Sequence, residues 1–320
     1  MFNYHHAIQF FLKRKVSLDY VAIAARALSL SMLGIFVPIY IFTLGYSLNS
    51  IILYYILLTA SVGALSPFAT KLISKIGIKK SIMISFPLLI IFNIALFAVE
   101  NYGINIFWAL SPLILSQMFF WFAFHADFSK NIDHKKTGHE IGTITILSLS
   151  LKSIGPILSA FIIKFFGFDI LFIIVSIILL LALIPLFLSE EKYIKSRFSF
   201  GDLFRKEHIK YYAVFFAEGA SRTIELNFWP LFIFILLKDF LVVGYAGSLL
   251  FIAVIFTTYL SASYTDSNKK YLFMKIGSVL YAGSWFIRTI VKTFSNLLGA
   301  TFFTGIAQTI LVIPFASVFY

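Results

Sequence analysis

The sequence has no cysteine and few charged residues. Among its 320 residues, 12% are charged and 60% are hydrophobic, and the mean hydropathy is +0.93. The lack of cysteine excludes disulfides and thiolate metal sites. A soluble domain of this length needs far more polar surface, so we expect a membrane protein that crosses the bilayer several times.

Several sequence patterns are also missing. The alternating pattern of a lipid-facing β-barrel is absent, and continuous apolar runs of about 20 residues indicate an all-α fold instead. No phosphate-binding glycine loop, nucleophile elbow or HExxH motif occurs, so we expect neither an enzyme nor a cofactor. A polar region after the fourth apolar run contains metal-ligand residue types without tight spacing, and we expect no metal there. These residues are His125, Asp127, Asp133, His134, His139 and Glu140.

The apolar runs divide the chain into two unequal parts. We expect an N-terminal cytoplasmic segment at 1–19, a six-helix half at 20–188, a cytoplasmic linker at 189–211 and a second half at 212–320 with four helices. Because the second half has two runs fewer and the last run has no polar flank, we expect a fragment that lacks two helices. The ten runs are Tyr20–Leu44, Ser50–Ile73, Ser81–Val99, Ile104–Phe124, Ile141–Phe165, Phe168–Leu188, Tyr212–Leu237, Phe240–Ala262, Tyr271–Val291 and Asn296–Tyr320.

Basic residues are distributed unevenly between the two sides. Lys and Arg gather in the N-terminal segment and after the second, fourth, sixth and eighth runs, whereas the other side has only Lys164, Lys238 and Lys292. The positive-inside rule then predicts a cytoplasmic N-terminus and a place in the cytoplasmic membrane. The net charge of +12 is therefore expected to contact membrane lipids, not nucleic acid.

The two parts of the chain share an internal repeat. Phe228–Phe234 (FWPLFIF) matches Phe36–Phe42 (FVPIYIF) 192 residues earlier. At the same offset Glu218 corresponds to Arg26 and Asp266 to Ser74. One offset that relates distant pairs of segments indicates a duplicated unit.

This repeat, with six runs before a charged linker, resembles the major facilitator superfamily (MFS) of secondary transporters. The family's gating pattern after its second helix, roughly G-x-L-A-D-R-x-G-R-K, is similar to Thr70–Lys80, although Thr70 and Ser74 replace the first Gly and the Asp. The second copy keeps the acid as Asp266. The positions that fit the pattern are Leu72, Lys75, Gly77 and Lys79 or Lys80. We also expect Asp127, after the fourth run, to contribute to gating.

A second motif lies in the fifth run. Gly155-Pro156-Ile-Leu-Ser159-Ala160 is similar to the family's G-P-x-x-G-G antiporter motif, with small residues in place of both final glycines. Small residues permit close approach of helices, and proline bends a helix. The resemblance implies a helix crossing at the pore.

Charged residues inside the runs are the candidates for a solute or proton pathway. Glu218, Arg222 and Glu225 lie within roughly 60° of one another on an α-helix. A charge at the membrane centre costs at least about 2.5–3.5 kcal/mol, so we expect this face to meet protein or water. The other expected pathway residues are Arg26 as a partner for an acid, Lys152, Tyr40 and Trp229.

Alternatives remain open for several of these charges. Glu225 could carry the coupled proton, or Glu218, Arg222 and Glu225 could form a purely structural charge network. Lys152 could face a cavity, where it binds an anion or pairs with an acid, form a structural ion pair, or extend its side chain to the interface. Arg288, near the end of its run, is expected to extend its side chain to the interface.

The resemblance implies a monomeric secondary transporter that moves a small solute by alternating access. The Gly155-Pro156 motif favours proton-coupled efflux by antiport. Uptake of an anionic metabolite is an alternative, because the buried charges sum to +1. A membrane scaffold that transports nothing is a second alternative.

Overall fold

The computed structural model describes residues 14–131, 137–188, 191, 209–261 and 270–319. Every regular element in these ranges is a helix. Eight helices are long and apolar enough to cross a membrane, which identifies a multi-pass membrane protein. They are Val21–Thr43, Leu48–Ile76, Ile78–Tyr102, Ile106–Ala126, Ser148–Phe187, Tyr211–Leu237, Phe240–Thr258 and Phe294–Phe315.

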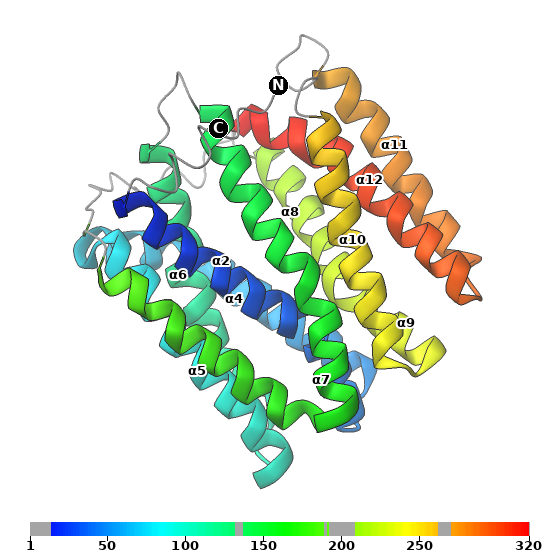
Figure 1. Ribbon diagram of the computed structural model, residues 1–320, viewed down its shortest axis with the longest axis horizontal. Coiled ribbons are helices and arrows are strands. Elements are labelled where there is room, and N and C mark those ends of the chain that lie inside the picture. The colour runs from blue at the N-terminus through cyan, green and yellow to red at the C-terminus, as the bar shows by residue number, and fades with distance from the viewer. Residues whose placement is uncertain (1–13, 132–136, 189–190, 192–208, 262–269, 320) are drawn as a thin grey trace.

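The first part of the chain folds around the two helices that contact each other most, α2 and α7 (Figure 1). A short break at Ile35 and Phe36 separates α2 from α3, whose first turn contains Pro38. The elements are α2 (Arg14–Gly34), α3 (Val37–Thr43), α4 (Leu48–Ile76), α5 (Ile78–Tyr102), the 3-10 helix η1 (Ile106–Ala109), α6 (Leu110–Asn131) and α7 (Thr137–Phe187).

A glycine divides α7 into two legs. Gly167 has φ 83° and ψ 176°, a backbone conformation that L side chains rarely adopt. Figure 1 shows the chain turning back at this point, with the first leg beside α10 and the second beside α5. The predicted runs Ile141–Phe165 and Phe168–Leu188 correspond to these two legs.

The second part begins at α8, after the predicted linker, most of which lies outside the described residues. A π-helical turn, η4, joins α8 to α9, and α11 packs on α12 at the outer edge (Figure 1). The predicted run Tyr271–Val291 overlaps α11, which contains Lys275 and Arg288 and is not among the eight candidate spans. The elements are α8 (Ile209–Thr223), η4 (Ile224–Phe228), α9 (Trp229–Leu237), α10 (Phe240–Ser261), α11 (Lys270–Thr289) and α12 (Phe294–Phe319).

Helix starts repeat at the offset found in the sequence. Elements begin at 37 and 229 and at 48 and 240, each pair 192 residues apart. In the first pair, Pro38 and Pro230 each follow a break in regular α-helix. Proline is favoured in a first turn because its missing N–H has no intrahelical partner there.

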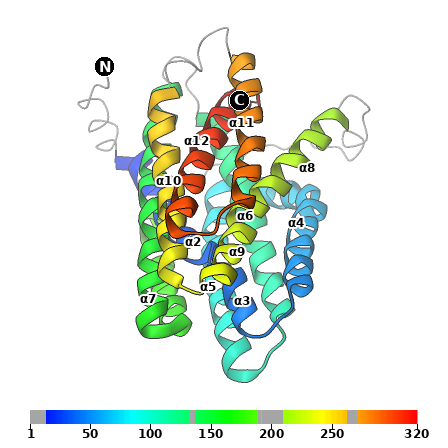
Figure 2. The same cartoon turned by 90° about the vertical axis from the view of Figure 1, so that its right-hand side faces the viewer.

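Close helix contacts connect the two parts of the chain. A Cβ added to Gly244 of α10 would lie 2.9 Å from the Pro156 carbonyl oxygen of α7. One turn later, the Ser248 hydroxyl accepts a hydrogen bond from Ile157 N at 3.2 Å. Figure 2 shows α7 and α10 together on one side of the molecule, with α8 on the opposite side.

Candidate functional site

Arg26 of α2 is a buried cation without an ion pair among the described residues. Its side chain is 1% exposed. Nη2 donates to the Ser116 hydroxyl at 3.2 Å, and that hydroxyl donates to the Ser85 carbonyl at 2.7 Å. The guanidinium carbon lies 3.7 Å from the centre of the Phe120 ring, a cation–π distance. Nε and Nη1 have no hydrogen-bond partner in the described structure.

Glu225 of η4 and Arg288 of α11 form a buried ion pair. Arg288 Nη2 donates to Glu225 Oε1 at 2.6 Å, and the two side chains are 3% and 0% exposed. The Arg288 guanidinium also lies 4.2 Å from the Trp229 ring and 4.4 Å from the Trp285 ring. The prediction that Arg288 reaches the membrane interface is wrong, because the ion pair and both indoles hold it inside.

The Glu225–Arg288 pair leaves polar groups unsatisfied. Glu225 Oε2, Arg288 Nε and Nη1, Trp229 Nε1 and Thr301 Oγ1 have no hydrogen-bond partner among the described residues. A cavity of about 10 Å³ touches Glu225, Trp229 and Thr301 from the second part of the chain and Ile35 from the first. Glu225 therefore lies beside the small cavity between the two parts of the chain.

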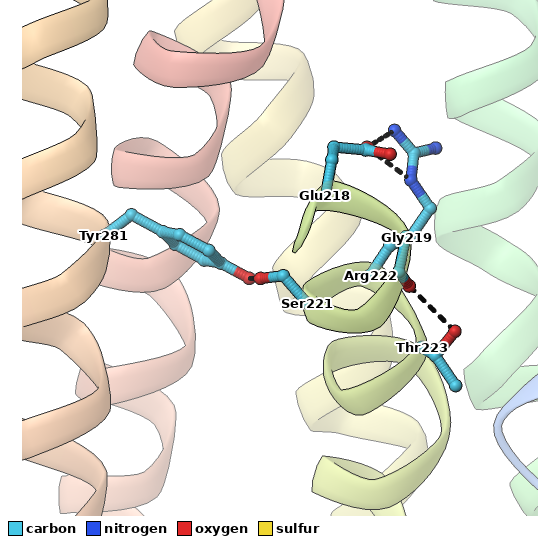
Figure 3. Close-up of polar contacts among 6 residues, drawn as sticks. All are labelled: Glu218, Gly219, Ser221, Arg222, Thr223 and Tyr281. Atoms are coloured by element: carbon cyan, nitrogen blue, oxygen red, sulfur yellow. Dashed lines mark hydrogen bonds and ion pairs between the residues drawn. The ribbon is translucent and has the colours of Figure 1, made fainter. Parts of the chain in front are cut away.

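Glu218 and Arg222 form a separate pair on α8. Arg222 Nε donates to Glu218 Oε1 at 2.9 Å, and the side chains of Arg222 and Glu218 are 52% and 29% exposed. Figure 3 shows these two side chains together, while Ser221 extends to Tyr281 of α11 at 3.0 Å.

The prediction that Arg26 pairs with an acid of the stretch 218–225 is wrong. Glu225 binds Arg288, and Glu218 binds Arg222 within its own helix. The prediction assumed 100° per residue along the whole stretch, whereas Ile224–Phe228 forms a π-helical turn with a different spacing.

Lys152 of α7 is half-buried, and no hydrogen bond or ion pair connects it to another described residue. It lies close enough to Arg222 and Arg26 for their positive charges to interact with its own. All three cations are among the residues that the sequence placed in one pathway.

Two predicted aromatic pathway residues have different surroundings. Trp229 stacks against Arg288, at the ion pair. Tyr40 instead lies in the packed core of the first copy, where its hydroxyl donates to the Leu96 carbonyl at 2.8 Å. Its ring contacts Phe168 and Phe172, so the shared face predicted for Tyr40 and Glu225 is not observed.

The motif of the fifth run lies where α7 crosses both α2 and α10. A Cβ on Gly155 would meet the Ser31 side chain and lie 3.1 Å from Met32 N, both on α2. Pro156 contacts α10, and Ser159 is fully buried with a hydroxyl that lacks a partner among the described residues. The small residues therefore permit close helix approach, as their chemistry predicts.

Glu191 contacts the predicted gating loop, and the sequence analysis did not predict this contact. Its carboxylate accepts from Lys79 N at 2.9 Å and from Lys80 N at 3.1 Å, at the N-terminus of α5. Gly77, with φ 102°, leaves room for it. Exposed N–H groups at a helix start attract a carboxylate, but no local pattern shows that Glu191, over 100 residues away, supplies it.

The remaining predicted gating residues are Lys75, Asp127 and Asp266. Lys75 lies in the last turn of α4. The Asp127 side chain and all of Asp266 lie outside the described part of the chain, as do most residues of the polar region after the fourth run. Within the described part, no three metal-ligating side chains gather.

The sequence is similar to a distantly related protein. No family model matches the sequence. The chain is 23% identical over 211 residues to the uncharacterized protein YqgE of Bacillus subtilis (strain 168). The match covers 63% of this chain and 49% of the relative, so the chain spans about half the length of the curated protein that it matches.

Proposed function

We propose that this protein is an MFS-type secondary transporter that moves a small solute by alternating access. The observation that carries the proposal is the repeat of helix starts at 192 residues, with a break before Val37 and before Trp229. Transporters of this class consist of repeated units with the solute site between them, and interrupted helices often form that site. Glu225 lies within one such interruption.

Proton-coupled efflux is the proposed mode of transport, with the Glu225–Arg288 pair as the coupling group. A carboxylate paired with an arginine inside the membrane can take up a proton and release the arginine. Glu225 has one oxygen bound to Arg288 and one without a partner among the described residues, and it lies beside a small cavity between the two parts of the chain. Protonation at that oxygen would weaken the pair and favour rearrangement.

A flux assay on the full chain in proteoliposomes tests the proposal. A panel of labelled solutes is offered with and without an imposed pH gradient, next to protein-free vesicles. A transporter moves at least one solute faster than the protein-free vesicles, and the pH gradient drives its accumulation. A membrane scaffold gives the flux of empty vesicles for every solute.

A further inference from the structure

The charges of the described residues around the site do not balance. Four cations lie on the helices around it, namely Arg26, Lys152, Arg222 and Arg288, and two of them are neutralised, Arg222 by Glu218 and Arg288 by Glu225. Arg26 and Lys152 have no ion pair among the described residues. An unpaired charge inside a membrane protein is costly, so two on packed helices favour an anionic ligand.

The helix crossing brings the two unpaired cations to similar heights. Helices α2 and α7 meet at Ser31 and Gly155, and both run in the same general direction through the membrane (Figure 1). Arg26 lies five residues before this crossing and Lys152 three residues before it. At 1.5 Å per residue, they differ in height by only about 3 Å.

The surroundings of Arg26 orient its guanidinium and leave donors free. Ser116 holds Nη2 and the Phe120 ring covers one face, while Nε and Nη1 remain unbonded in the described structure. Guanidinium N–H groups match the oxygens of carboxylates and phosphates. Lys152 is half-buried and adds a second positive charge from the neighbouring helix.

We propose that Arg26 and Lys152 bind a carboxylate or phosphate group of the transported solute. This inference rests on the proposed transport function and specifies its substrate class as small organic anions. Lys152, the more exposed of the two, meets the anion first, and Arg26 binds it when the helices around the site rearrange. A neutral or cationic solute would leave both charges uncompensated.

Anion-dependent thermal stability of the purified full chain tests the site without a transport assay. The probes are succinate and inorganic phosphate, compared with chloride and choline at equal ionic strength. Succinate or phosphate binding to the folded state raises the midpoint of unfolding in a saturable way. Chloride and choline give no saturable rise.

Three variants locate the effect. Arg26→Gln and Lys152→Gln each remove a charge-assisted contact, which raises the half-saturating anion concentration about ten- to hundredfold. Lys164→Gln is the matched control, because Lys164 lies on the same helix but pairs with Asp239 at 3.7 Å on an exposed surface. If Arg26→Gln does not fold, Lys152→Gln decides alone, since its side chain is only half-buried.

The outcomes separate this inference from the transport proposal. No saturable response to either anion, or an equal response in Arg26→Gln, Lys152→Gln and the wild type, overturns the anion site. Flux of an uncharged solute without any anion response overturns the anion site and leaves the transporter standing. Site-dependent anion binding without flux of any anion supports the binding site and overturns transport.

Discussion

Two buried arginines differ in whether a carboxylate of the described structure neutralises them. Arg288 has a carboxylate at 2.6 Å and two indole faces, whereas Arg26 has a hydroxyl and one phenyl ring. A buried charge that keeps its partner stabilises little in net terms, but loss of one partner leaves the other charge unpaired. The Glu225–Arg288 pair should therefore respond very differently to single and double substitution.

A double-mutant cycle tests this coupling. Glu225→Gln or Arg288→Gln alone should destabilise the protein by about 3–5 kcal/mol, because each leaves a buried charge without its partner. The double variant should be less destabilised than the sum of the two. Thermal unfolding in detergent measures the stability of the wild type, the two single variants and the double variant.

The exposed pair on α8 provides the control. Glu218→Gln and Arg222→Gln should each change stability by less than about 1 kcal/mol, since solvent screens this pair. If the losses of stability in Glu225→Gln and Arg288→Gln simply add up in the double variant, the two side chains do not form the buried ion pair.

At this scale the sequence predicted the burial of Glu225 but not its partner. The cost of a charge facing lipid was sufficient to expect Glu225 inside the protein, and it is 1% exposed. Its partner Arg288 is 63 residues away on a helix of the outer edge. Such a pairing depends on how α8, η4 and α11 pack, which local spacing does not reveal.

At the scale of elements, interruptions and close crossings determine where side chains point. Pro38 and Pro230 indicated corresponding positions in the two copies, and α3 and α9 begin one residue before them. The π-helical turn Ile224–Phe228 had no sequence signal of its own. It invalidated the α-helical projection from which one face was predicted for Glu218 and Glu225.

The crossing of α7 with α2 gives a test of packing. Gly155→Ala should destabilise the protein by about 1–3 kcal/mol, because the new methyl group meets the Ser31 side chain and the backbone at Met32. Gly63→Ala on α4 is the control, since nothing lies within 4 Å of its added Cβ, and it should stabilise by about 0.5–1 kcal/mol. Equal unfolding midpoints of the two variants would contradict the close crossing.

At the scale of the whole molecule, the two parts of the chain contact each other through packed helices. α3 contacts α9, and α7 packs along α10. Hydropathy predicted the helical membrane fold, and the 192-residue offset predicted the shared starts of α3 and α9 and of α4 and α10. They could not predict the backbone geometry of the turn at Gly167 or the binding of Glu191 at the N-terminus of α5. Both depend on contacts between distant segments.

Labelling of introduced cysteines tests the orientation in the membrane. The chain has no native cysteine, so single cysteines at 135, 205 and 238 report without background. The positive-inside rule predicts that an impermeant thiol reagent labels Lys238→Cys from outside intact cells and leaves Lys135→Cys and Arg205→Cys unlabelled. External labelling of the latter two would reverse the orientation.

The most direct test of proton-coupled transport is solute flux in proteoliposomes that contain Glu225→Gln. The solute is one that the wild type carries, and Glu218→Gln serves as the matched control on the adjoining helix. The account predicts that Glu225→Gln loses pH-gradient-driven accumulation but keeps solute exchange, while Glu218→Gln retains both. Undiminished pH-driven accumulation in Glu225→Gln would contradict the coupling role of the buried pair.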